Sequence, residues 1–100
     1  MDLIVLSRTS GMVKMKIGNV VLATAGKEKG QLFVIVNLDD KYAYLSDGKR
    51  LKAIKPKKKS LKHIRLAGSE SLSEDEVLDK NERVNAKIRK FLSKLRSEHV

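Results

Sequence analysis

Lysine and arginine are concentrated in one stretch of this 100-residue chain, and that stretch is the part best suited to bind a charged ligand. The whole chain has a net charge of +10. The segment from Lys41 to Leu66 supplies most of it, because it contains ten basic residues and a single acid, Asp47. Like charges this close repel one another, and an anionic partner relieves the repulsion. Phosphate is the first candidate, since clustered cations release counterions when they bind nucleic acid. The ten are Lys41, Lys49, Arg50, Lys52, Lys55, Lys57, Lys58, Lys59, Lys62 and Arg65.

Two shorter features would bring cations of this kind against a phosphate backbone. Gly26 and Gly30 bracket Lys27 and Lys29, and glycine lets a loop bend sharply while its amides approach an anion. Pro56 favours extended backbone, which would splay the lysines at 57–59 along a nucleic acid. Each feature also has a plainer interpretation. The first is then a surface hairpin with solvated lysines, and the second is a polar loop that keeps the chain soluble.

Three ring side chains near these cations are candidate base contacts. His63 either stacks on a base or donates to phosphate, or it is an exposed strand residue without a role. Tyr42 and Tyr44 are two residues apart and share one side of a strand, where they either stack on bases or pack at the edge of the fold. We expect no metal site, because the other histidine is His99, near the C-terminus, and no acid lies near His63 at ligand spacing.

Catalytic chemistry has little support in the sequence. The chain has no cysteine and no spaced set of serine, histidine and acid, and Asp39, Asp40 and Asp47 occupy turn positions where aspartate is favoured for local reasons. We therefore expect a protein that is not an enzyme and has no cofactor. The apolar run at 3–6 is too short for a membrane span, and the lack of cysteine fits a reducing compartment. These features predict a cytoplasmic protein without a membrane partner.

The elements that would position the basic residues are short strands. Apolar runs predict strands at 13–17, 20–23, 32–36 and 42–45, and the continuous run at 32–36 is typical of a central strand buried on both faces. Asp47 and Gly48 predict a two-residue hairpin turn between Leu45 and Leu51. Short strands at this spacing predict a mainly β fold, a small barrel over residues 13–66. Residues 1–12 stay unassigned, either as an edge strand or as a loose arm.

A change in composition after Gly68 predicts a helical tail. Residues 67–72 have the character of a polar linker, and Ser73 and Glu76 form a capping-box pattern that begins a tail at 73–97, as one helix or as two that break near Asn81. Apolar residues recur there at helical spacing, so the helix either docks on its own domain or offers this stripe to a protein partner or a second copy. We expect a chain cut after Gly68 to keep a folded, ligand-binding barrel. The stripe consists of Val77, Val84, Ile88, Phe91 (or Leu92) and Leu95.

An ordered series of short motifs runs from Gly18 to His63. It comprises Gly18 and Val21, the loop Ala25-Gly26-Lys27-Glu28-Lys29-Gly30, the run Val34-Ile35-Val36, then Ser46-Asp47-Gly48-Lys49 and Pro56-Lys57-Lys58-Lys59-Ser60-Leu61-Lys62-His63. The first three resemble the KOW motif, a β-hairpin element of ribosomal proteins and NusG-type transcription factors. The whole series, over about residues 17–66, looks like the small bacterial KOW-domain RNA-binding proteins, which are similar to the fourteenth large-subunit ribosomal protein of archaea and eukaryotes. Phe33 stands where the family pattern often has a further glycine, so the match is to a subgroup.

This resemblance implies an SH3-like β-barrel of the KOW type that binds RNA. With the charge pattern, it leads us to predict a non-catalytic protein that binds structured ribosomal RNA of the large subunit, mostly through phosphates. Two alternatives stay open. One is an adaptor that binds proteins through the barrel and the amphipathic tail, and the other is a NusG-like factor that also accepts DNA. The predicted RNA-binding residues are Gly26, Lys27, Lys29, Gly30, Lys49, Arg50, Lys52, Lys55, Lys57, Lys58, Lys59, Lys62, His63 and Arg65.

Overall fold

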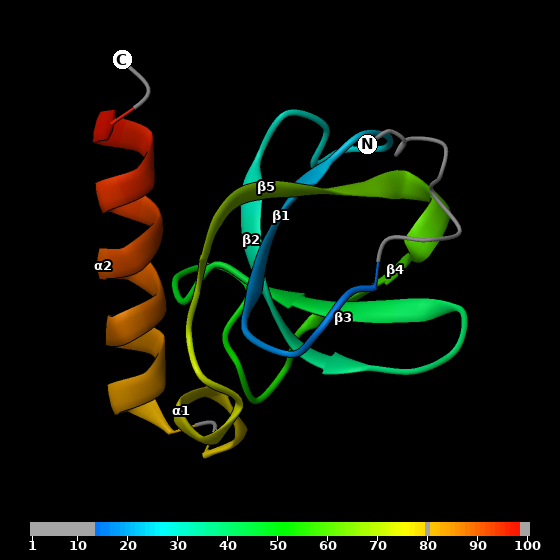
Figure 1. Ribbon diagram of the computed structural model, residues 1–100. Coiled ribbons are helices and arrows are strands. Elements are labelled where there is room, and N and C mark those ends of the chain that lie inside the picture. Colours follow the sequence, from blue (N-terminus) through cyan, green and yellow to red (C-terminus); the bar gives the residue numbers. More distant parts are fainter. Residues whose placement is uncertain (1–13, 80, 99–100) are drawn as a thin grey trace.

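The computed structural model describes residues 14–79 and 81–98, and its fold is built on one antiparallel sheet of five strands (Figure 1). The arm at residues 1–12 and His99 lie outside the described residues. The prediction of a mainly β fold is confirmed. The strands are β1 (Asn19–Ala23), β2 (Leu32–Leu38), β3 (Tyr42–Ser46), β4 (Lys57–Ser60) and β5 (Ile64–Ser71), in the spatial order β4-β3-β2-β1-β5.

The sheet is open in the part of the chain that the structure describes, so the closed barrel that we expected is not completed by hydrogen bonds. The two edges are β4 and β5, which are not neighbours in the strand order, although only the 3₁₀ turn η2 (Leu61–His63) separates them along the chain. β4 has four residues, all paired with β3. This short edge strand is too brief to reach a second partner before η2 redirects the chain toward β1.

β2 lies at the centre of the sheet and is buried on both faces, as its continuous apolar run predicted. Phe33 and Ile35 face one side and Val34 and Val36 the other, because successive side chains of a strand alternate. The sheet therefore has a core on each side. We call the core that contains Phe33 and Ile35 the inner core, and the one that contains Val34 and Val36 the helix-side core.

The tail consists of two helices, α1 (Glu74–Leu78) and α2 (Glu82–Glu98), which confirms the predicted break near Asn81. The predicted capping box is also present. The Ser73 hydroxyl accepts the Glu76 amide at 3.2 Å, and the Glu76 carboxylate accepts the Ser73 amide at 3.0 Å. A second cap begins α2, where the Asn81 side-chain oxygen accepts the Val84 amide at 3.0 Å. These caps satisfy amides that the first turn of each helix leaves unpaired.

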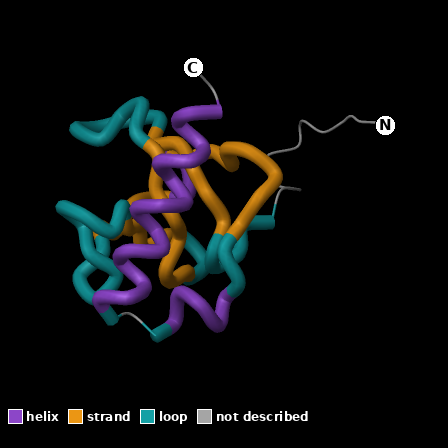
Figure 2. Tube along the Cα trace, turned by 90° about the vertical axis from the view of Figure 1, so that its left-hand side faces the viewer, coloured by secondary structure: helices purple, strands orange, loops and turns teal. Residues whose placement is uncertain are grey.

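The apolar stripe of the tail packs on the chain's own sheet. Four side chains of α2 are buried in the helix-side core together with Val20, Val34 and Val36. Figure 2, seen from the side of α2, shows this helix lying over the sheet. The docking interpretation is thus the correct one, and a protein partner would have to contact other faces of α2. The four are Val84, Ile88, Leu92 and Leu95, so Leu92 rather than the half-buried Phe91 occupies the inward position.

Two local predictions were wrong. Residues 14–16 have no regular structure and Ile17 and Gly18 form a turn, where the Asn19 side chain accepts the Lys16 amide at 2.8 Å. The supposed linker at 67–72 is mostly β5, which continues to Ser71 opposite Asn19. A cut after Gly68 would thus divide a strand and remove the helices that complete the helix-side core.

Asp47 and Gly48 do not form the two-residue hairpin turn that we expected. They begin an irregular loop that extends to Pro56, which we call the ridge loop. The Asp47 carboxylate accepts the amides of Lys49 and Leu51, both at 2.9 Å, and the Ser46 hydroxyl donates to the Leu51 carbonyl at 2.7 Å. These local side-chain bonds replace the strand pairing that a hairpin would need, since aspartate and serine compete for nearby backbone groups.

Candidate nucleic-acid interface

β4 places the three lysines that follow Pro56 on opposite faces of the sheet. Lys57 lies opposite Leu45 and Lys59 opposite Ala43, so both belong to the face of the inner core. Lys58 lies opposite Tyr44 and belongs to the other face. The segment is extended, as Pro56 predicted, but the lysines do not line one surface.

Lys59 fastens the loop at 26–30 to β4. Its side chain is only 10% exposed, and its ammonium donates to the Ala25 carbonyl at 2.8 Å and to the Glu28 carboxylate at 3.1 Å. Lys57 adds a second contact to Glu28, at 3.7 Å. The hydrogen bond from Lys59, aided by the charges of both lysines, lowers the pKa of Glu28 below its ordinary value. Lys59 was predicted to bind RNA, but here its ammonium already has two protein partners.

Two amides of the same loop donate to backbone carbonyls of the protein. The Lys29 amide donates to the Gly26 carbonyl at 3.2 Å, and the Gly30 amide donates to the Ala23 carbonyl at 2.8 Å. Gly26 and Gly30 have φ values of +81° and +86°, the left-handed conformation that explains why glycine stands at both positions. These two bonds and the two glycine conformations define the turn, and the side chains of Lys27 and Lys29 supply its positive charge.

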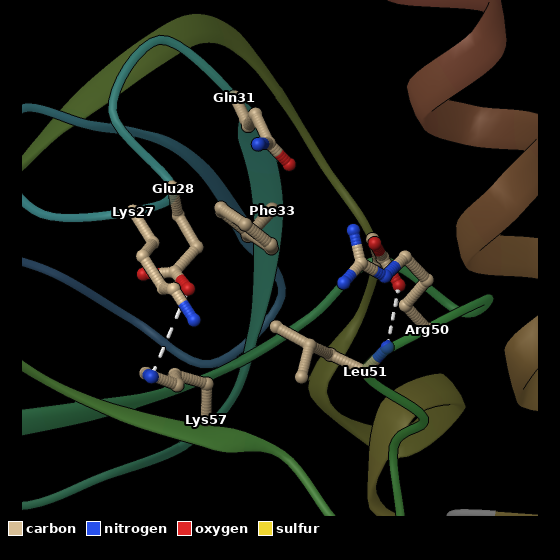
Figure 3. A pocket seen from close by; sticks show the side chains of 8 residues that line it. Lys27, Glu28, Gln31, Phe33, Arg50, Leu51 and Lys57 are labelled. Carbon is tan, nitrogen blue, oxygen red and sulfur yellow. Dashed lines mark hydrogen bonds and ion pairs between the residues drawn. The ribbon is translucent and has the colours of Figure 1, made fainter.

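Three basic side chains from three separate segments surround one hollow of about 410 Å³ on the face of the inner core. Lys27 comes from the glycine loop, Arg50 from the ridge loop and Lys57 from β4. Figure 3 shows Lys27 and Lys57 on one side of this hollow and Arg50 on the other, with the ring of Phe33 between them. We call it the central hollow. Its remaining lining residues are Glu28, Gln31, Asp47 and Leu51.

The two acids of the central hollow are both held by structural bonds. Glu28 is paired with Lys57 and Lys59, and Asp47 accepts two amides of the ridge loop. Glu28 was not among the residues predicted from the sequence, although it is the one acid inside the glycine loop and the partner of two of the predicted lysines. The position of Glu28 between Lys27 and Lys29 is the sequence feature that could have identified it as part of this site.

The two tyrosines do not form a paired stacking platform. Tyr44 packs against the helix-side core, and its hydroxyl donates to Asp39 at 3.1 Å, which raises the pKa of Tyr44. The ring of Tyr42 carries the ammonium of Lys58, 4.3 Å from its centroid. Tyr44 therefore takes the packing role that the sequence left open, while Tyr42 is engaged in a cation–π contact on the face away from the central hollow.

The other predicted residues of the ridge loop, η2 and β5 are exposed and lie outside the central hollow. Lys49, Lys52 and Lys55 lie on the ridge loop, and the ammonium of Lys52 lies 3.8 Å from Glu82 of α2. Lys62 and His63 lie on η2, and Arg65 lies on β5. None of these lines the central hollow, where three of the predicted cations meet, but Lys52 and Lys55 line an adjacent hollow together with Arg50 and Lys57.

Metal and membrane sites can be assessed over the described ranges 14–79 and 81–98. Within them, no three histidine, cysteine or acidic side chains gather in a group that could hold a metal ion. Over the same ranges, neither the length nor the apolar character of any helix suffices to cross a membrane.

Substituting Gly30 by alanine should destabilise the fold by about 1–2 kcal/mol, because an L-residue at φ +86° is strained even where, as here, no atom of residues 14–79 and 81–98 lies within 4 Å of the added methyl group. Gly68, at φ +79° in equally open space on β5, provides the matched control, and Gly68→Ala should cost a similar amount. Urea unfolding measures both. A Gly30→Ala variant as stable as the wild type would show that the loop readily takes another conformation.

No protein-family model matches the chain. None of the curated proteins resembles it significantly either.

Proposed function

We propose that the protein is a non-catalytic RNA-binding protein that holds the phosphate backbone of structured RNA in the central hollow. The observation that carries the proposal is the convergence of Lys27, Arg50 and Lys57 from three separate segments on one hollow. Cations held close together in a fold repel one another and lower its stability. Bound phosphates neutralise these cations and relieve the repulsion, which favours binding. Asp47 accepts two amides of the ridge loop, whereas Glu28 contacts Lys57 at 3.7 Å as well as Lys59, so a bound phosphate would share Lys57 with Glu28.

Contacts to phosphate should outweigh contacts to bases. Of the ring side chains near the basic residues, Phe33 is buried, Tyr44 is packed and Tyr42 contacts Lys58, which leaves the exposed ring of His63 for base stacking. A-form RNA also hides its deep groove from side chains, and proteins read such helices by shape and backbone. We therefore propose recognition of RNA shape with weak dependence on base sequence.

The finer proposals follow the resemblance to KOW-domain proteins. The curved five-stranded sheet, with a glycine loop between β1 and β2, is compatible with an SH3-like fold of the KOW type. The ligand that the resemblance favours is ribosomal RNA of the large subunit, in the cytoplasm. Support for the adaptor alternative is weaker, because the apolar stripe of α2, which would have served a protein partner, is buried against the sheet.

The test is the salt dependence of RNA binding by a triple variant, Lys27→Gln, Arg50→Gln and Lys57→Gln. The slope of log affinity against log salt should flatten by about two to three units, roughly one for each phosphate that the variant no longer neutralises. The titration uses a large-subunit ribosomal RNA fragment, with duplex DNA as competitor. DNA should compete poorly, since the proposed ligand is A-form RNA.

The matched control changes three exposed cations of α2 that do not line the central hollow, Arg83, Lys90 and Lys94, to glutamine. It alters the net charge equally, so a general effect of charge would flatten both slopes alike. An equal change in the two variants would place binding outside the central hollow. If duplex DNA competes as well as RNA, the NusG-like alternative is favoured.

A further inference from the structure

A second basic hollow lies between the ridge loop and α2. It has a volume of about 270 Å³ and is lined by Asp47, Lys49, Arg89, Ser93 and Arg96. Figure 1 shows the loop that follows β3 reaching toward α2. We call this the helix hollow. Three of its five lining residues are basic, and two of those come from a tail whose charges cancel overall, which is why the charge pattern of the sequence did not reveal it.

The ridge loop is clamped to α2 at two points, so the helix hollow has a fixed shape. The Arg89 guanidinium donates to the Gly48 carbonyl, and the buried side-chain oxygen of Asn85 accepts the Ala53 amide at 2.8 Å. Gly48 lies so close to α2 that a methyl group there would collide with the Asn85 carbonyl. The backbone of Lys49, the next residue, is thereby held close to α2.

The chemistry of the helix hollow suits a phosphate. Two guanidinium groups and one ammonium supply the charge, and arginine matches the paired oxygens of a phosphate. Ser93 adds a hydroxyl that can donate to an oxygen. The acid at its rim, Asp47, has an oxygen occupied by the amides of Lys49 and Leu51, and Arg89 has an acidic neighbour, Glu82, at 3.8 Å.

The two hollows lie on either side of the same short segment. Asp47 lines both of them, Lys49 lines the helix hollow and Arg50, its neighbour, lines the central hollow. The segment from Asp47 to Leu51 therefore separates two cationic depressions, and adjacent residues contribute to opposite sides. An RNA backbone with one phosphate in the central hollow can cross this segment and place another phosphate against the second set of cations.

We propose that the helix hollow is a second phosphate subsite, so that a bound RNA crosses the ridge loop with phosphates on both sides of it. This inference rests on the proposed function and extends the RNA surface onto α2. It makes the tail part of the binding surface, through Arg89 and Arg96, as well as part of the core.

The test is a double variant, Lys49→Gln with Arg96→Gln, titrated with the large-subunit RNA fragment. Arg89 is left in place because its guanidinium holds Gly48. We expect about a tenfold or greater loss of affinity at low salt and a salt slope flatter by about two units. Circular dichroism should match the wild type, because both changed side chains are exposed.

The control is Lys90→Gln with Lys94→Gln, which removes the same charge from exposed positions of α2 outside the helix hollow. Its affinity should stay within about threefold of the wild type. If Lys49→Gln with Arg96→Gln binds like the wild type or like this control, the subsite is overturned while RNA binding in the central hollow stands. A wild-type chain that binds no RNA overturns both proposals.

Discussion

A chain that ends at Gly68 is expected to lose its cooperative fold. The cut divides β5 and removes both helices, whose buried side chains form one cluster with Val20, Val34 and Val36. Three valines on the central strands would then face water, and the inner core would have to stabilise this small sheet by itself. Thermal unfolding followed by circular dichroism should show no cooperative transition. A fragment that melts cooperatively would show that the inner core alone sustains the sheet.

A single substitution provides a graded form of the same experiment. Leu92 is completely buried in the helix-side core, and Leu92→Ala should destabilise the full chain by about 2–5 kcal/mol, a large part of the stability of an ordinary domain. Lys94→Ala, two residues along on the exposed side of α2, should change it by less than about 0.5 kcal/mol. Equal effects of the two substitutions would mean that α2 does not depend on this packing.

The parts of the fold that could be predicted are those specified by neighbouring residues. The alternation and continuity of apolar residues predicted β1, β2 and β3, and the capping box at Ser73 predicted the start of α1. Two predictions failed where partners distant in the sequence contribute to the conformation. β5 continues past Leu66 because it returns to β1, where Ser71 lies opposite Asn19. The ridge loop combines the local bonds of Asp47 and Ser46 with the contacts by which α2 holds Gly48 and Ala53.

The residues of the candidate sites likewise comprise some that the sequence identified and others whose roles depend on the fold. Charge concentration identified the segment that contributes Arg50 and Lys57, and the glycine spacing identified Lys27. No sequence pattern could show that Lys59 turns toward Ala25 and Glu28, because that follows from strand register and from the packing of the glycine loop on β4. Arg96 was missed for a similar reason, since it meets Lys49 only once α2 has docked.

Replacing Lys59 by methionine should lower stability by about 1–3 kcal/mol while leaving the salt slope of RNA binding unchanged. The substitution keeps the side chain's length but leaves the Ala25 carbonyl and the Glu28 carboxylate without their shared donor. Lys58→Met is the matched control. Lys58 contacts the Tyr42 ring on the opposite face, and removing that exposed cation–π interaction should cost less than about 1 kcal/mol. Urea unfolding and RNA titration measure the two effects separately.

Acid pH should narrow the difference in stability between the wild type and Lys59→Met. The pKa of Glu28 is lowered in the folded state, chiefly by the hydrogen bond from Lys59, so its contribution is complete above the ordinary glutamate pKa, about 4.3, and is lost as the pH falls through the lower folded-state value. Asp39 and Glu76 also have lowered pKa values, because backbone amides donate to them, and they weaken both proteins equally as the pH falls. The comparison of the two proteins therefore isolates Glu28. If the difference in unfolding free energy between wild type and Lys59→Met stays constant from pH 7 to about pH 3, Lys59 acts through its contact with the Ala25 carbonyl alone, and the ion pair with Glu28 does not hold the loop.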